Sequence, residues 1–154
     1  MPKKPQDKQP TPRSLARLLA VQGLYLLHMN EDATPENIVE DFKKMSLGAR
    51  ENMPLFSEVD QVLLADILKG GFERQDEIRD TLEKVLTKGW SYSRLETILA
   101  SILEGGAYEL LGRPDIPHPV IINEYVNITH AFYEGGEPGF VNGILDELAK
   151  SLRA

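Results

Sequence analysis

The sequence contains no cysteine among its 154 residues. This absence excludes disulfide bonds, zinc sites built on thiolates and catalysis by a thiol, and it agrees with a reducing cytoplasm. The chain also has no run of about 18 apolar residues, so we expect no membrane-spanning helix. Its N-terminus is polar and lacks the apolar core of a signal peptide. The sequence therefore predicts a cytoplasmic protein that does not enter a membrane.

Motifs for metal binding and catalysis are missing as well. The histidines His28, His118 and His130 show neither i,i+4 spacing nor an HExxH context, which argues against a metal site. Glu124, next to Asn123, falls on the second turn of a predicted helix, where a carboxylate usually interacts with the helix dipole. We therefore expect no catalytic residue, no metal and no cofactor, and hence a protein that is not an enzyme.

Acidic residues outnumber basic ones over the chain as a whole, but not near the N-terminus. The formal net charge is −7, but residues 1–20 hold five basic residues and one acidic residue, a local charge of +4. The basic residues are Lys3, Lys4, Lys8, Arg13 and Arg17. A basic segment on an acidic body is typical of nucleic-acid contact, and a solvated tail is the alternative interpretation. Residues 1–12 contain four prolines and no apolar periodicity, so we expect a flexible basic arm before a single domain at 13–154.

Apolar residues recur at helical spacing along the rest of the chain, and no strand-like alternation persists. Capping residues and prolines mark where helices begin. These predicted starts are Thr11-Pro12, Thr34-Pro35, Ser57, the pair Ser93 and Glu96, and Pro117-His118-Pro119. We expect breaks or loops at residues 48–54, 112–114 and 134–139. The predicted fold class is all-α, with six to seven helices.

Glycines inside three of these helices require a structural reason, because an interior glycine costs about 1 kcal/mol relative to alanine. We expect a break or a sharp kink at Gly70-Gly71. For Gly105-Gly106 and for Gly143 we expect close packing of a neighbouring helix.

Several motifs resemble the NusB family of bacterial transcription antitermination factors. In the C-terminal half they are Asp115-x-Pro117-x-x-Val120-x-Ile122-Asn123-Glu124 and Phe140-Val141-Asn142-Gly143-x-Leu145-Asp146. Upstream, Ala20-Val21-Gln22-x-Leu24-Tyr25 resembles the first helix of that family, and Tyr108-Glu109-Leu110 resembles its central helix. The matching landmarks run from about residue 13 to residue 148, although residues 33–90 match in pattern only.

The resemblance implies two three-helix bundles that share a core, with the long first helix at the centre. It also implies an RNA-binding protein without enzymatic activity. Members of the family pair with ribosomal protein NusE and bind the boxA element of ribosomal RNA leaders. Together with other Nus factors they help RNA polymerase to resist termination.

The family binds RNA through an arginine-rich start of the first helix, which implies RNA-binding roles here for Arg13 and Arg17, supported by Lys3, Lys4 and Lys8. Ser14 and Leu15 stand where the family often has further arginines, and Glu104 stands where Leu-Arg is common, so positive charge is reduced. Gly136 precedes a predicted helix N-terminus that suits an RNA phosphate. Phe140 and Tyr25 are candidates for base contacts, with core packing as the alternative. The resemblance further points to Leu24 and Tyr25 as contacts for the partner protein.

Two other functions fit the same residues. One is a protein–protein adaptor that keeps the NusE contact but binds RNA weakly by itself. The other is a stand-alone relative of the NusB-like domain of rRNA methyltransferases, which would not be an enzyme because no methyl-donor motif is present. The sequence leaves open whether the second apolar stripe of the first helix, which contains Ala16, Ala20, Leu24 and Leu27, faces the core or a partner.

Overall fold

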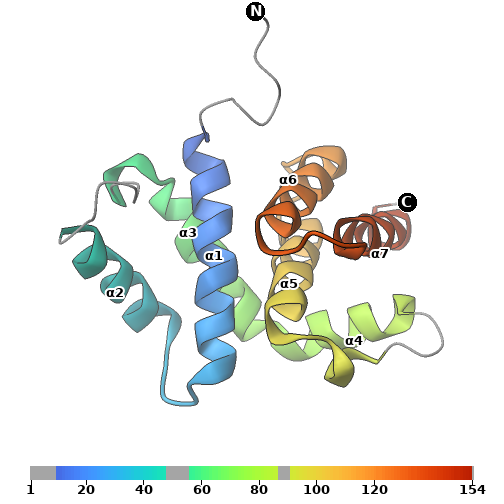
Figure 1. The fold of residues 1–154 in the computed structure, drawn as a ribbon, viewed down its shortest axis with the longest axis horizontal. Coiled ribbons are helices and arrows are strands. Elements are labelled where there is room, and N and C mark those ends of the chain that lie inside the picture. The colour runs from blue at the N-terminus through green and yellow to red at the C-terminus, as the bar shows by residue number, and fades with distance from the viewer. Residues whose placement is uncertain (1–9, 48–55, 87–90, 154) are drawn as a thin grey trace, which may run out of the picture.

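The computed structural model describes residues 10–47, 56–86 and 91–153 (Figure 1). These residues form seven α-helices, two short 3-10 helices and no strand, which confirms the all-α prediction. The α-helices are α1 (Pro12–Met29), α2 (Pro35–Leu47), α3 (Gln61–Glu73), α4 (Gln75–Val85), α5 (Thr97–Gly112), α6 (His118–Phe132) and α7 (Glu137–Leu152), and the 3-10 helices are η2 (Phe56–Glu58) and η3 (Tyr92–Arg94). The predicted loop at 48–54 and the lysines Lys3, Lys4 and Lys8 lie outside the described residues.

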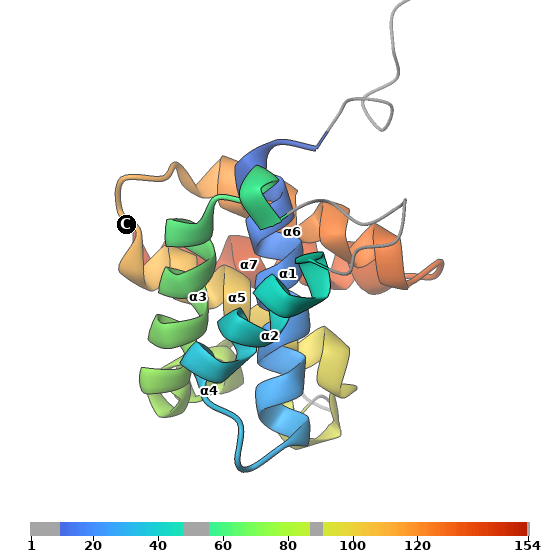
Figure 2. The ribbon, with the colours of Figure 1, turned by 90° about the vertical axis from the view of Figure 1, so that its left-hand side faces the viewer.

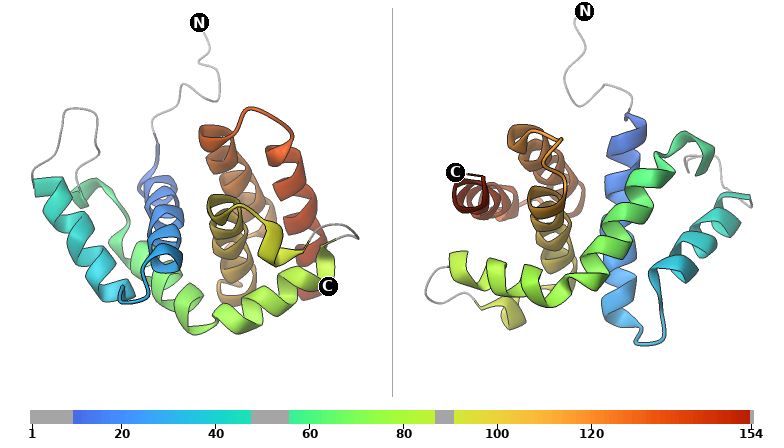
Figure 3. Two further views of the ribbon diagram at one scale, coloured as in Figure 1. Left: turned by 60° about the horizontal axis from the view of Figure 1, so that its bottom comes forward. Right: turned by 180° about the vertical axis from the view of Figure 1, so that it is seen from behind.

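The helices form two groups of three. In the first group α1, α2 and α3 contact one another, and in the second α5, α6 and α7 do so. Helix α4 crosses from one group to the other and packs on α5 and α7, as both views in Figure 3 show. Contacts between α1 and α5 join the groups, and one continuous hydrophobic cluster extends through both. The expected pair of bundles with a shared core is therefore confirmed.

Helix α1 is the member of the first group that makes most contacts with the second, and it runs through the middle of the view in Figure 2. Its second apolar stripe faces the core. Ala16 and Ala20 are fully buried, and Leu24 is only 4% exposed. The small side chains of the two alanines allow α3 and α5 to approach α1 closely. The helix begins as predicted: the Thr11 hydroxyl accepts a hydrogen bond from the Ser14 amide at 3.0 Å. At the start of α2, Thr34 accepts from the Asn37 amide at 3.2 Å in the same way.

Two predicted helix starts are wrong. Ser57 lies in η2, and α3 begins only at Gln61, where the Asp60 carboxylate accepts a hydrogen bond from the Leu63 amide at 2.9 Å. The Ser93 and Glu96 pair does not form a capping box, because Ser93 lies in η3 and no side-chain cap closes the start of α5. In both places a short 3-10 turn precedes the α-helix, and capping residues alone do not reveal such a turn.

The glycine pairs have different roles in the structure. Helix α3 runs unbroken through Gly70 and Gly71, so the predicted kink there is wrong, and the change of direction comes at Arg74. A Cβ atom on Gly70 would lie 2.2 Å from the Tyr108 ring, so the glycine makes room for that ring on α5. The chain direction therefore changes one turn later than the sequence indicates.

Close packing explains one of the two remaining glycine sites and not the other. A Cβ atom on Gly105 would lie 2.7 Å from the Tyr125 ring, and one on Gly106 would lie 2.8 Å from Leu145. These distances confirm that α6 and α7 approach α5 closely at this point. The prediction for Gly143 is wrong: no neighbouring atom lies within 4 Å of where its Cβ would be, because the residue faces solvent.

Candidate RNA and partner interface

Arg17 is buried, contrary to the prediction that it contacts RNA from an exposed face. Its side chain is 2% exposed, and its Nε and Nη2 atoms each donate a hydrogen bond of 2.9 Å to the carboxylate of Glu109 on α5. The Tyr125 hydroxyl donates to the same carboxylate at 2.6 Å. Burial and the adjacent Glu109 carboxylate raise the pKa of Tyr125, so its hydroxyl keeps the proton that it donates. Arg17 therefore joins α1 to α5 and offers no donor to RNA.

Arg13 remains available at the first turn of α1. Its side chain is 51% exposed, and the Asp60 carboxylate lies 3.7 Å from its Nε atom. An exposed ion pair at this distance contributes little to the stability of the protein, so the guanidinium of Arg13 can exchange the Asp60 carboxylate for a phosphate. Beside it, the Ser14 hydroxyl lies 3.0 Å from both carboxylate oxygens of Glu124 on α6, which fixes the start of α1 against α6. Of the two predicted arginines, only Arg13 stays a candidate RNA contact.

A groove of about 580 Å³ lies between the start of α5 and the start of α7. We call it the α5–α7 groove, and its lining residues are Arg94, Leu95, Glu96, Leu99, Gly136, Glu137 and Phe140. It brings together the predicted RNA residues Gly136, which is exposed at the N-cap of α7, and Phe140, which is partly buried against the core. Sequence reasoning missed Arg94, because no local pattern places η3 next to α7.

The charges of this groove suit nucleobases better than phosphates. Glu96 and Glu137 contribute carboxylates, whereas Arg94 is the basic residue among the described lining residues. Glu137 also lies in the first turn of α7, where its negative charge competes with any anion approaching the Gly136 end. Apolar and aromatic surface beside carboxylates can accept a stacked base and the amino groups on its edge. A phosphate contact at Gly136 therefore stays a prediction, and a base contact at Phe140 fits the local chemistry.

An apolar stripe on the outer side of α1 is exposed in its last two turns. Leu26 is 41% exposed, Met29 is 60% exposed, and Tyr25 is partly exposed beside them. Leu24, which the resemblance assigned to partner binding, is buried instead, and its side chain packs against Gly71 of α3. The assignment of Leu24 is therefore wrong, whereas Tyr25 stays a candidate within the stripe formed by Tyr25, Leu26 and Met29.

Glu104 does not present its negative charge to solvent, because its side chain is buried in a polar network. Its carboxylate lies 2.6 Å from Nε2 of His28 on α1 and accepts a hydrogen bond from the Tyr92 hydroxyl of η3. The guanidinium of Arg79 on α4 lies over the Tyr92 ring, 5.0 Å from its centroid. The hydrogen bond with Glu104 raises the pKa of His28, whose side chain is 35% exposed. The expectation that Glu104 reduces the positive charge met by RNA is therefore wrong.

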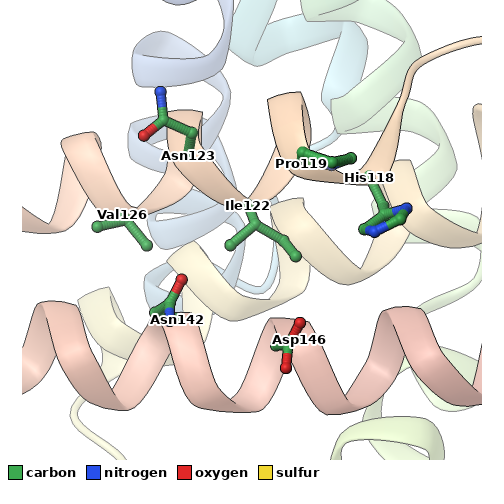
Figure 4. Close-up of a pocket in the computed structure, with 7 residues that line it drawn as sticks. All are labelled: His118, Pro119, Ile122, Asn123, Val126, Asn142 and Asp146. Atoms are coloured by element: carbon green, nitrogen blue, oxygen red, sulfur yellow. The ribbon is translucent and has the colours of Figure 1, made fainter.

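A second groove, of about 290 Å³, lies between α6 and α7 (Figure 4). Ile122 points from α6 toward α7, while Asn142 and Asp146 point from α7 toward α6. Lys150 lies 3.3 Å from the Asp146 carboxylate and balances its charge. The lining residues that the structure describes include no lysine or arginine, so this groove lacks the cations that a phosphate site needs.

Comparison with known proteins settles the family. Residues 14–150 match the model of the NusB family. The chain belongs to the NusB family. A transcription antitermination protein NusB from Sphingopyxis alaskensis is 38% identical over 96% of this chain and 98% of its own length. Another, from Novosphingobium aromaticivorans, is 41% identical over 92% of this chain and 95% of its own.

Solved NusB structures share this fold. The T. maritima NusB structure superimposes with a TM-score of 0.73 at 29% identity, covering 92% of this chain and 93% of the other. A structure of the antitermination factors NusB and NusE in complex with dsRNA gives a TM-score of 0.70 at 20% identity, covering 91% and 97%. The second similarity supports the NusB fold without transferring individual contacts.

Two residues of the family-like motif Tyr108-Glu109-Leu110 have internal roles in this NusB-family chain. Glu109 binds Arg17 and Tyr125, and the Tyr108 hydroxyl donates to Asp66 of α3 at 2.6 Å.

Within the described residues no helix is long and apolar enough to cross a membrane. The same residues hold no cluster of three or more histidine or carboxylate side chains able to bind a metal ion.

Proposed function

We propose that this NusB-family protein is a transcription antitermination factor that binds boxA-containing RNA together with ribosomal protein NusE. It acts in the cytoplasm, without enzymatic activity, in a complex with other Nus factors and RNA polymerase. The observation that carries this proposal is the family match over residues 14–150, with relatives of nearly equal length that are transcription antitermination proteins. Relatives of this length also favour a stand-alone factor over a separated methyltransferase domain.

The RNA surface in this proposal has two parts that α6 connects. Arg13, with Lys3, Lys4 and Lys8 of the N-terminal arm, contacts phosphates at the start of α1. The α5–α7 groove holds an unstacked base near Phe140 and Gly136. Glu124 fixes α6 to α1 through Ser14, and from there α6 runs about 12 Å to its last residue, just before the groove. A single strand that follows α6 would meet both parts.

The partner surface is the apolar stripe of Tyr25, Leu26 and Met29. Exposed apolar side chains that lie together on one helix are typical of a protein–protein contact. The stripe occupies the C-terminal half of α1, whereas Arg13 lies at its N-terminal end, so NusE and the phosphates would use opposite ends of one helix. The adaptor alternative shares this surface and differs only in binding RNA weakly when NusE is absent.

The decisive experiment is a titration of boxA RNA at several salt concentrations, with and without NusE. Arg13→Ala should lower the log–log salt slope by about 0.7, the value for one phosphate contact on a single strand. Lys150→Ala is the matched control, since Lys150 is an exposed cation near the other end of α7 and should leave the slope unchanged. RNA binding only in the presence of NusE would favour the adaptor, and no binding in either condition would refute the proposal.

The partner surface has its own test. Met29→Asp should weaken NusE binding by roughly tenfold or more in calorimetry, because a charge at a buried apolar contact is costly. Met45→Asp on α2 is the matched control, since Met45 is similarly exposed and lies outside the stripe. Equal affinities for the two variants would exclude the stripe as the NusE site.

A further inference from the structure

The wall of the α5–α7 groove that contains Arg94 and Leu95 is a short 3-10 turn and not a long helix. Helix η3 spans only Tyr92–Arg94, and the backbone hydrogen bonds that it makes within the described residues are local ones, such as that from the Leu95 amide to the Tyr92 carbonyl at 3.1 Å. A single turn of this kind has little stability of its own. Its position therefore depends on side chains that attach it to the rest of the molecule.

Leu95 is buried in the hydrophobic core, and two polar side-chain contacts also attach this segment. On one side the Tyr133 hydroxyl donates to Glu96 at 3.0 Å and ties the end of the segment to the residue that follows α6. On the other side the Tyr92 hydroxyl donates to the buried carboxylate of Glu104, and Arg79 lies over the ring. Glu104 also binds His28, so the same carboxylate connects the groove wall to the last turn of α1.

We propose that Glu104 is a positioning residue that holds the η3 wall of the α5–α7 groove, and that protonation of His28 strengthens this hold. The inference rests on the proposed function, because it concerns RNA binding in the same groove. It assigns a regulatory input, pH, to a site where the sequence pattern suggested only an unfavourable charge.

The charges around Glu104 give the direction of the pH effect. Arg79 and Glu83 on α4 face Tyr92, Tyr92 itself faces Glu104 from η3, and His28 faces it from α1. Burial raises the pKa of Tyr92, which therefore stays a neutral donor. His28 is the group that changes charge near neutral pH, and its protonated form makes the stronger, charge-assisted bond to the carboxylate. The wall is therefore held more firmly at lower pH.

Sign and range follow from the shifted pKa of His28. The pKa of His28 is raised above the ordinary value of about 6.5, so the additional stabilisation of η3 by protonated His28 is fully present below that value. It is lost as the pH rises through the folded-state pKa of His28. The Kd for RNA should rise roughly two- to fivefold from about pH 6 to about pH 8, the range expected for a half-exposed ion pair.

The experiment measures RNA affinity and NMR spectra of the full chain across this pH range. Glu104→Gln keeps the shape of the side chain and removes its charge, and His28→Gln removes the titrating group. His130→Gln is the matched control, since His130 is an exposed histidine on α6. Tyr92→Phe keeps the ring under Arg79 but removes the hydroxyl donor.

We expect the Tyr92–Leu95 amide signals to titrate with the His28 ring in the wild type and in His130→Gln. In the Glu104→Gln and His28→Gln variants these signals and the Kd should become independent of pH, while the signals of the other helices stay in place. Tyr92→Phe should uncouple the η3 amides although His28 still titrates. A pH-dependent Kd that persists in Glu104→Gln, or η3 amides that ignore His28, would overturn the inference. If no RNA binds at any pH, the proposed function fails, and the NMR titration still decides whether Glu104 positions η3.

Discussion

Removing the guanidinium of Arg17 should strongly destabilise the fold. Arg17→Ala deletes both 2.9 Å hydrogen bonds to Glu109 and leaves that carboxylate, which is fully buried, with the Tyr125 hydroxyl as its remaining neutral donor. The second nearby carboxylate, Glu124, lies 3.7 Å from the Arg17 guanidinium and loses that charge as well. The variant therefore creates an uncompensated charge at the contact between the two helix groups.

The expected cost follows from other buried ion pairs. Removing one partner of such a pair typically costs about 3–5 kcal/mol, because the remaining charge stays desolvated. Domains of this size have a free energy of unfolding of about 5–15 kcal/mol. The loss would therefore be a large fraction of the total stability. Tyr125→Phe, which removes one hydrogen bond to the same carboxylate, should cost about 1.5–3 kcal/mol.

The assay is urea unfolding followed by circular dichroism, with Arg13→Ala as the control. Arg13 is half exposed and weakly paired, so its variant should change the free energy of unfolding by less than about 0.5 kcal/mol. Replacing all three partners, as in Arg17→Met with Glu109→Leu and Tyr125→Phe, should recover most of the loss, because neither a charge nor an unpaired hydroxyl is then left buried. A loss of less than about 1 kcal/mol in Arg17→Ala would show that the ion pair is not buried as described.

Two further predictions concern glycine positions and pH. Gly143→Ala should stabilise the protein by up to about 1 kcal/mol in thermal unfolding, since its Cβ would face open space, whereas Gly106→Ala should destabilise it by about 1–3 kcal/mol because its Cβ would lie 2.8 Å from Leu145. A shift of the Tm in the same direction for both variants would contradict this difference between the surroundings of Gly106 and Gly143. For His28, the wild type should exceed His28→Gln in free energy of unfolding below about pH 6.5, and the difference should shrink as the pH rises through the raised pKa. A constant difference between pH 5 and pH 9, measured by urea unfolding, would refute this linkage.

Features encoded by neighbouring residues could be predicted from the sequence. The starts of α1 and α2 depend on a threonine and an amide three residues later, so Thr11 and Thr34 were identifiable. The start of α6 follows from Pro117 and Pro119 in the same local way. The start of α3 was misplaced because Ser57 and Asp60 are both good caps, and a 3-10 turn decides between them.

The role of each glycine could not be read from the chain, because it depends on what lies opposite. Gly106 and Gly143 both lie inside helices and have apolar neighbours in the sequence. The sequence therefore predicts close packing at both positions. Gly106 faces Leu145 across the junction of α5 and α7, while Gly143 falls on the side of α7 that faces solvent. Helical periodicity shows which face of a helix is apolar. It does not show whether another helix covers a residue that lies near the edge of that face.

Whether the charged residues of the site are accessible to RNA could not be predicted from the sequence. Arg17 counted as part of a basic N-terminal segment, and Glu104 counted against RNA binding, yet both are buried and bound to partners 92 and 76 residues away in the sequence. Formal charge describes what a ligand meets only for side chains that remain in solvent. Without Arg17, Arg13 is the accessible basic residue of segment 1–20 among the residues that the structure describes. Two arginine contacts would give a change in salt slope of about 1.4, whereas the structure leaves one arginine and about 0.7. Arg13→Ala therefore tests the one arginine contact that the structure leaves, and the burial of Arg17 is tested separately by the unfolding of Arg17→Ala.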